Sequence, residues 1–250
     1  MHFLGILLNA MRRPTLLFAL AAALLVAVCV TLDARSQRVS FRTADGVTIS
    51  ATWFEPSFRP APAVILVHML GRSRRDWDDA ASRLASAGIG ALALDLRGHG
   101  ESSWGRGTEG SADHSVLVRD IEAARRYLGS RSDVQHSRIG LAGASIGANL
   151  VALQGAADAG IVSVALLSPS LDYRGLRIEA AVRKYGSRPM LLVVSDEDAY
   201  ARRSAEDLKK AGGGIRELLT LSGAGHGTNM LGRAPELGPA LVAWFQRTLQ

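Results

Sequence analysis

The stretch Gly143-Ala144-Ser145-Ile146-Gly147 has the pattern Gly-x-Ser-x-Gly. A short apolar run at 139–142 precedes it, and helix-forming residues begin directly after the serine. The pattern therefore falls on a turn from a buried strand into a helix. Such a turn needs glycines for close backbone approach and exposes the hydroxyl at the helix N-terminus. We interpret Ser145 as a nucleophile, the alternative being a turn serine that only caps the helix.

Outward from this turn, the chain alternates between short apolar runs and segments with helical spacing. Two stretches, at 38–43 and 47–54, alternate between apolar and polar residues and are rich in β-branched and aromatic side chains, which predicts a hairpin. Buried strands are then expected at 63–67, 89–94, 139–142, 161–167 and 190–194, and a last strand at 215–221. Helices are expected at 77–87, 116–128, 146–157, 175–185, 199–211 and 235–249. This alternation predicts one mainly parallel sheet with helices on both faces. The segment 170–189 has room for at most one short helix, so no separate lid domain is expected.

The composition is that of a folded globular protein, with 48% apolar and 21% charged residues among 250. The formal net charge is +6, but the arginines are scattered and form no basic tract with interleaved aromatic residues. We therefore expect a basic solvated surface and no nucleic-acid partner.

The N-terminus has the layout of an export signal. Arg12-Arg13 precede an uncharged apolar run at 16–32, as a charged n-region precedes an h-region. We predict that residues 1–34 form a signal peptide or, if retained, a membrane anchor, and that 35–250 form the exported domain, periplasmic or extracellular. Contact with a membrane is expected only through this N-terminal segment.

No metal or cofactor is expected in the exported domain. The only cysteine, Cys29, lies in the N-terminal apolar run, so the domain has neither a disulfide nor a cysteine nucleophile. The stretch 105–110 fits Gly-x-Gly-x-x-Gly, but a long polar loop separates it from the preceding strand, whereas a dinucleotide-binding turn follows its strand directly. The sequence also contains no His-x-x-x-His spacing.

A serine nucleophile requires a base that a third group orients. His226 lies between glycines in Gly223-Ala224-Gly225-His226-Gly227, just beyond the last predicted strand. The acid is expected between Ser145 and His226 along the chain, and Ser195-Asp196-Glu197-Asp198 follows the strand at 190–194. We favour Asp198 over Asp196, because a turn of several residues is needed to aim the side chain back across the sheet edge.

The oxyanion of the intermediate needs two preorganised backbone N–H donors. The amide of Ile146, directly after the serine, is one. The second is expected from the loop after the strand at 63–67, with Leu70 the first choice and Met69 the alternative. His68 would then be structural and would hold this loop by a ring hydrogen bond.

These residues give the chain a resemblance to the α/β-hydrolases, in particular to their dienelactone-hydrolase-like and esterase branches, from about Arg38 onward. The motifs that carry it occur in the family's order: the His68 loop, Asp95-Leu96-Arg97-Gly98-His99-Gly100-Glu101-Ser102, the Ser145 elbow, the Asp198 turn and Gly225-His226-Gly227. The resemblance implies an eight-stranded, mostly parallel sheet, a triad of Ser145, Asp198 and His226, and a loop-shaping role for 97–100. Met69 and Ser195 depart from it, since the family usually has glycine at both places.

The expected activity is that of a metal-independent serine hydrolase that cleaves small or medium-sized carboxylic esters through an acyl-enzyme. Two other readings remain open. An aminopeptidase, amidase or thioesterase could use the same scaffold, because loops set specificity. A noncatalytic binding protein would keep the fold but normally lacks a member of the triad.

Overall fold

The computed structural model describes residues 35–104 and 113–250. The predicted signal or anchor at 1–34 lies outside the described residues and stays a prediction, and 105–110 lies outside them as well. Within the described ranges, no helix combines the length and the apolar character that crossing a membrane requires.

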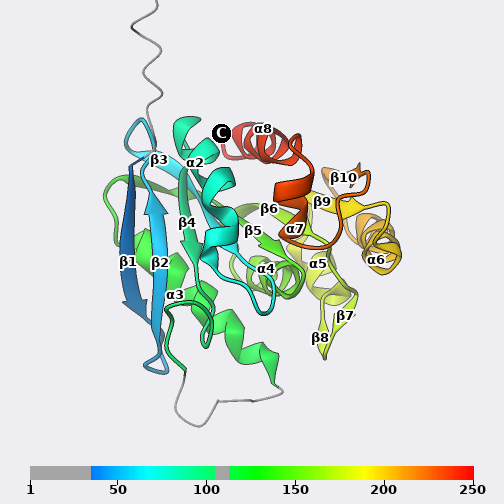
Figure 1. The fold of residues 1–250 in the computed structure, drawn as a ribbon, viewed down its shortest axis with the longest axis horizontal. Helices are drawn as coiled ribbons and strands as arrows, with labels where there is room; N and C mark the ends of the chain where they lie inside the picture. Colours follow the sequence, from blue (N-terminus) through cyan, green and yellow to red (C-terminus); the bar gives the residue numbers. More distant parts are fainter. Residues whose placement is uncertain (1–34, 105–112) are drawn as a thin grey trace, which may run out of the picture. The chain divides into compact units, whose positions relative to one another are not determined.

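Eight strands form one sheet in the order β1-β2-β4-β3-β5-β6-β9-β10 (Figure 1). The first two strands pair antiparallel with each other, β2 is antiparallel to β4, and every other neighbouring pair is parallel. The predicted eight-stranded, mostly parallel sheet is therefore confirmed. The strands are β1 Ser36–Arg42, β2 Thr48–Phe54, β3 Ala61–Val67, β4 Gly90–Leu94, β5 Val134–Ala144, β6 Ile161–Leu167, β9 Met190–Ser195 and β10 Arg216–Leu221.

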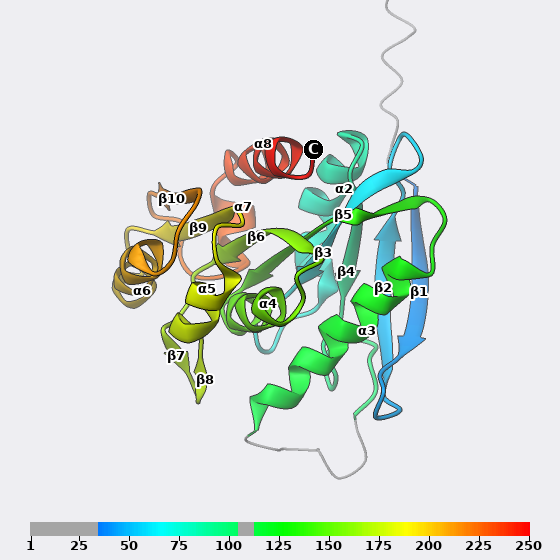
Figure 2. The same cartoon turned by 180° about the vertical axis from the view of Figure 1, so that it is seen from behind.

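Helices cover both faces of this sheet, as Figures 1 and 2 show from opposite sides. The first face carries α2 (Asp78–Ser86), α7 (Asn229–Arg233) and α8 (Leu237–Thr248). The other face carries α3 (Val118–Gly129), α4 (Ile146–Ala157), α5 (Glu179–Tyr185) and α6 (Ala199–Lys210). Short 3-10 turns, η1 (Arg74–Trp77) and η2 (His114–Leu117), lead into α2 and α3.

Strand β3 shows why the central runs are continuously apolar. Val64 and Leu66 pack into the apolar cluster under α2 and α8, whereas Ile65 and Val67 pack into the cluster under α3 and α4. All four side chains are fully buried. Because successive residues of a strand point to opposite faces, a strand covered on both sides is apolar at every position.

The connection between β6 and β9 differs from the helix predicted at 175–185. A small hairpin of β7 (Asp172–Tyr173) and β8 (Leu176–Arg177) comes first, and α5 starts only at Glu179. Arg174 and Gly175 adopt positive φ values of 49° and 90°, and a carboxylate oxygen of Asp172 accepts the Gly175 N–H at 2.8 Å. This turn interrupts the helical pattern, and the described connection contains no separate lid domain, as predicted.

Candidate active site

Ser145 lies between the end of β5 and the start of α4, with φ 54° and ψ −118°. This sparsely populated backbone conformation costs about 1–3 kcal/mol at a residue with a side chain, so the surrounding structure must hold it. The Ser145 N–H donates to the Leu167 carbonyl on the neighbouring strand at 2.8 Å, and the Ser145 carbonyl accepts from Ala148 at 2.9 Å. The serine is thereby fixed at both its amide and its carbonyl.

Two glycines make this turn sterically possible. A Cβ atom at Gly143 would lie 2.2 Å from the Gly147 carbonyl oxygen, and one at Gly147 would lie 2.6 Å from the carbonyl oxygens of Val67 and His68. Since these neighbours are backbone atoms, no rotamer change relieves either clash. The Gly-x-Ser-x-Gly pattern therefore needs its two glycines because the backbones of β5, α4 and the end of β3 come too close together here for any side chain.

The structure brings Ser145, His226 and Asp198 together although they lie far apart in the sequence. The His226 Nε2 atom is 2.8 Å from the Ser145 Oγ atom, and His226 Nδ1 is 2.6 Å from an Asp198 carboxylate oxygen. With Nδ1–H donating to Asp198, Nε2 is the acceptor for the serine hydroxyl proton. The Ser145 side chain is nearly buried, while the His226 side chain is 47% exposed, so the imidazole borders solvent.

Asp198 and Asp196, the two acids considered from the sequence, have different partners. Asp198 is the N-cap of α6: one carboxylate oxygen accepts the Ala201 N–H at 3.2 Å and the other faces His226. Asp196 accepts from the Gly223 N–H and the Ser222 hydroxyl, both at 2.9 Å. The hydrogen bond from the Gly223 N–H, and to a lesser extent that from Ser222, lowers the pKa of Asp196. Asp198 thus contacts the imidazole, and Asp196 ties the loop that carries it.

His68 is held as a structural residue, and the expected ring hydrogen bond is confirmed. Its Nδ1–H donates to the Met69 carbonyl at 2.7 Å, and its Nε2 accepts the Leu96 N–H at 3.0 Å. The side chain is fully buried, and desolvation lowers its pKa to about 4. Both hydrogen bonds together require the neutral imidazole with its proton on Nδ1.

This burial predicts a pH dependence of stability. Because the pKa of His68 is lower in the folded state (about 4) than the ordinary 6.5, the unfolded chain binds a proton first as the pH falls. The stabilisation from His68 is therefore complete above pH 6.5 and is lost between pH 6.5 and pH 4. The loss from pH 7 to pH 5 is about 2 kcal/mol in the free energy of unfolding.

Urea unfolding at pH 7 and pH 5 measures this loss. The variant His68→Gln is the control, since glutamine also donates and accepts hydrogen bonds but does not titrate. We expect the difference between the two pH values to be smaller in the variant by about 2 kcal/mol. An equal difference in both proteins would show that His68 does not titrate on unfolding.

The three amides predicted to bind an oxyanion come from two elements. Ile146 is the first residue of α4, where the N–H groups have no acceptor within the helix. Met69 and Leu70 lie in the loop after β3, and both are half-buried. The Met69 side chain lies against Gly227, whereas Leu70 lines a small cavity. Which of these two amides serves stays open, and the assignment of all three stays a prediction.

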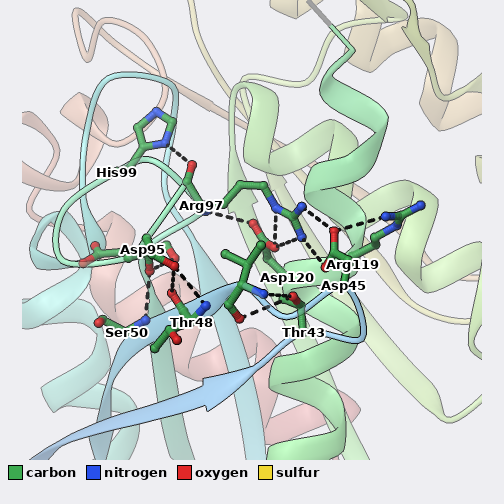
Figure 3. Close-up of polar contacts among 12 residues, drawn as sticks. Thr43, Asp45, Thr48, Ser50, Asp95, Arg97, His99, Arg119 and Asp120 are labelled. Atoms are coloured by element: carbon green, nitrogen blue, oxygen red, sulfur yellow. Dashed lines mark hydrogen bonds and ion pairs between the residues drawn. The ribbon is translucent and has the colours of Figure 1, made fainter. Parts of the chain in front are cut away.

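The loop after β4 is anchored by a buried ion pair (Figure 3). The Arg97 guanidinium donates to Asp120 on α3 at 2.6 and 2.8 Å, and the Arg97 N–H donates to the same carboxylate at 2.9 Å. A second carboxylate, Asp45 in the β1–β2 turn, accepts from Arg97 at 2.8 Å. Arg97 therefore fixes the loop that presents His99, whose ring centroid is 5.1 Å from that of His68.

A small, mostly apolar cavity of about 70 Å³ lies beside these loops. It is lined by Leu70, Arg97, His99, Trp104, Asp113, His114, Val116 and Leu117. The ring of His114 packs edge-on against Tyr173 of β7, with centroids 6.4 Å apart. Trp104 and Tyr173 thus border this region, and His114, interpreted from the sequence as a surface residue, is instead half-buried at the cavity.

Among the residues that the structure describes, no group of three acidic, histidine or cysteine side chains could hold a metal ion.

Sequence reasoning missed Ser168. It follows β6 directly, is fully buried, and its hydroxyl accepts the N–H of Gly227, the residue after His226, at 3.0 Å. The rule that reactive loops follow the carboxyl ends of parallel strands applies to it as it does to Ser145. That signal was present in the sequence, but nothing in the sequence shows which backbone group the hydroxyl contacts.

A protein-family model described as serine aminopeptidase, S33, matches residues 59–193, which is more than half of the chain. An uncharacterised abhydrolase domain-containing protein of Dictyostelium discoideum is 34% identical over 94 residues, 38% of this chain and 10% of that protein. The uncharacterised protein YfhR of Salmonella typhimurium is 29% identical over 160 residues, 57% of this chain and 52% of that protein. The chain thus spans about half or less of the length of these curated relatives.

Solved structures share the fold at low sequence identity. Dienelactone hydrolase from Anabaena variabilis superposes with a TM-score of 0.73 at 21% identity, over 87% of this chain and all of that one. A Pyrococcus furiosus esterase gives 0.71 at 17% identity, over 87% and 92%. The esterase domain of a Rhodothermus marinus protein gives 0.70 at 19% identity, over 86% and 100%. The chain has the α/β-hydrolase fold and belongs to the family described as serine aminopeptidase, S33.

Proposed function

We propose that this protein is a serine hydrolase of small carboxylic esters that works through an acyl-enzyme. The observation that carries the proposal is the chain of hydrogen bonds from Ser145 Oγ through His226 to Asp198. The serine lies on a strained turn at a helix N-terminus, as a nucleophile in this fold does. Family membership supports the hydrolase class, and the ester specificity is the further step.

The chemistry follows from the positions of the three side chains. Ser145 Oγ attacks the acyl carbon while His226 Nε2 takes its proton, and Asp198 stabilises the imidazolium that forms. The amides of Ile146 and of Leu70 or Met69 donate to the oxyanion. When the tetrahedral intermediate collapses, the C–O bond to the alcohol breaks and His226 returns the proton to the leaving oxygen. His226 then activates a water molecule, which releases the carboxylic acid and restores Ser145.

The size of the substrate is inferred from the cavity beside Leu70. A volume of about 70 Å³ has room for only a few carbon atoms, and its lining is mostly apolar. Leu70, the first-choice second oxyanion donor, is among the residues that line this cavity, and we infer that a short acyl chain occupies it while the carbonyl faces Ser145. The β7–β8 hairpin and α5 supply no separate lid that would enclose a long lipid chain.

A second candidate is the hydrolysis of amides, because the matching family model is described as serine aminopeptidase. The proposed triad chemistry is the same for esters and amides, and only the leaving group differs. An amide requires protonation of a poorer leaving group, so the two activities are separated by kcat/KM on matched substrates.

A substrate series tests the ester proposal. We expect kcat/KM for p-nitrophenyl acetate and butyrate to exceed that for the octanoate at least about tenfold, because mismatched chain length in a small apolar pocket costs about 1–3 kcal/mol. Aminoacyl p-nitroanilides and acyl thioesters are measured in parallel. Higher kcat/KM for the anilides would assign an aminopeptidase, and higher kcat/KM for the thioesters a thioesterase; either would overturn the ester assignment.

A further inference from the structure

The carboxyl end of β6 contacts both the serine turn and the histidine loop. The Leu167 carbonyl accepts the Ser145 N–H at 2.8 Å, and the next residue, Ser168, accepts the Gly227 N–H through its hydroxyl at 3.0 Å. Gly227 is bonded directly to His226. Two successive residues of one strand end therefore set the backbone positions of Ser145 and His226 relative to each other.

Ser168 is itself rigidly held. Its side chain is fully buried, and its backbone N–H donates to the Val193 carbonyl on β9 at 2.8 Å. Its φ is 48°, which lies in the left-handed region that favours glycine. The chain keeps a side chain at this position although glycine would adopt the backbone more readily, and the described contact of that side chain is the one to Gly227.

The histidine loop is held on its other side by the loop after β3. The Met69 side chain lies against Gly227, where a Cβ atom would come within 2.6 Å of the Met69 sulfur. The Thr228 hydroxyl hydrogen-bonds to Asp76, which in turn pairs with Arg72 at 2.9 Å. Gly227 is buried between these contacts and Ser168. From the side of the sheet, the Ser195 hydroxyl at the end of β9 accepts the Ala224 N–H at 3.0 Å, and the Ser168 hydroxyl holds the loop at Gly227, directly next to His226.

We propose that Ser168 is a positioning residue that holds the His226 imidazole within reach of Ser145 by fixing Gly227. This proposal rests on the proposed function, since it assigns no chemistry to Ser168 itself. Loss of the hydroxyl would leave the buried Gly227 N–H without its acceptor and let the histidine loop shift. A displacement of about 1 Å at a reacting group lowers the rate about 100-fold.

Two variants of Ser168 and one matched control test the proposal. Ser168→Ala removes the hydroxyl at the same φ, and Ser168→Gly removes it while relieving the backbone conformation. Ser163→Ala is the control, because Ser163 is also fully buried in β6 and its hydroxyl bonds to Thr248 at 2.7 Å. We expect kcat with p-nitrophenyl acetate to fall about 10- to 100-fold in both Ser168 variants, with KM changed less than about twofold. The kcat of Ser163→Ala should stay within about twofold of the wild type.

The split between kcat and KM separates positioning from folding. If Ser168 were only structural, its variants would have a lower melting temperature, as we expect for Ser163→Ala, but their folded fraction would keep the wild-type kcat. That result would overturn the positioning role and leave the proposed function standing. If the wild-type protein neither hydrolyses any of the esters nor reacts with a fluorophosphonate, the proposed function falls and the positioning role falls with it.

Discussion

Ester hydrolysis by Ser145→Ala is expected to be nearly abolished, with kcat lowered about 10⁴- to 10⁶-fold. The Ser145 Oγ atom forms the acyl-enzyme and lies 2.8 Å from His226 Nε2. Among the described residues, no other hydroxyl hydrogen-bonds to this nitrogen. The backbone donors and the cavity stay in place, so a small residual rate over that in water remains. Steady-state hydrolysis of p-nitrophenyl acetate measures the loss.

Melting temperature and circular dichroism are measured alongside the kinetics, to show that Ser145→Ala is folded and that its lost activity does not come from unfolding. Ser163→Ala serves again as the matched control, since it removes a buried, hydrogen-bonded hydroxyl from the neighbouring strand. A folded Ser145→Ala protein that retained more than about one per cent of the wild-type kcat would exclude Ser145 as the nucleophile, because removing a triad nucleophile costs far more than that.

The second large effect concerns the acid. We expect Asp198→Asn to lower kcat about 10⁴-fold, because an amide in place of the carboxylate stabilises the wrong tautomer of His226 and cannot balance the imidazolium. Asparagine is also a good N-cap, so the hydrogen bond from Ala201 at the start of α6 is kept. The loss therefore reports on the contact with His226 and not on the helix.

Asp196→Asn is the matched comparison, two residues away on the same turn. Its side-chain oxygen can still accept from Gly223 or Ser222, which hold the histidine loop. We expect its kcat to stay within about threefold of the wild type, since such exposed polar substitutions change little. A large loss in Asp196→Asn together with a small one in Asp198→Asn would move the acid of the triad to Asp196.

Much of the fold could be predicted because the sheet is covered on both faces. Continuous apolar runs marked the five strands β3, β4, β5, β6 and β9, and the alternation with helical segments predicted the parallel order. The edge strand β10 is only half-buried and contains Arg216 and Glu217, so its pattern is not continuously apolar. The hairpin at 172–177 escaped prediction because its two strands are two residues long. Its turn depends on a side-chain contact of Asp172 and on a positive φ at Arg174, neither of which changes the apolar pattern.

The site was predictable as far as strand ends and chain order determine it. Ser145, Asp198 and His226 each follow a strand of the sheet, and parallel strands bring their carboxyl ends to one edge. The contact of Ser168 with Gly227 was not predictable in this way, because it depends on where the Ser168 hydroxyl points and on how close the histidine loop comes to the end of β6. The choice between Leu70 and Met69 likewise depends on where two neighbouring amides point within one loop.

The most direct test is the reaction of the full chain with a fluorophosphonate probe, followed by peptide mass mapping. We predict one equivalent of label, carried by Ser145, and loss of ester hydrolysis in proportion to labelling. Asp198→Asn should label far more slowly, and Ser145→Ala should not label at all. Folded wild-type protein that stays unlabelled, or that carries the label on another serine, would contradict the assignment of Ser145 as the nucleophile.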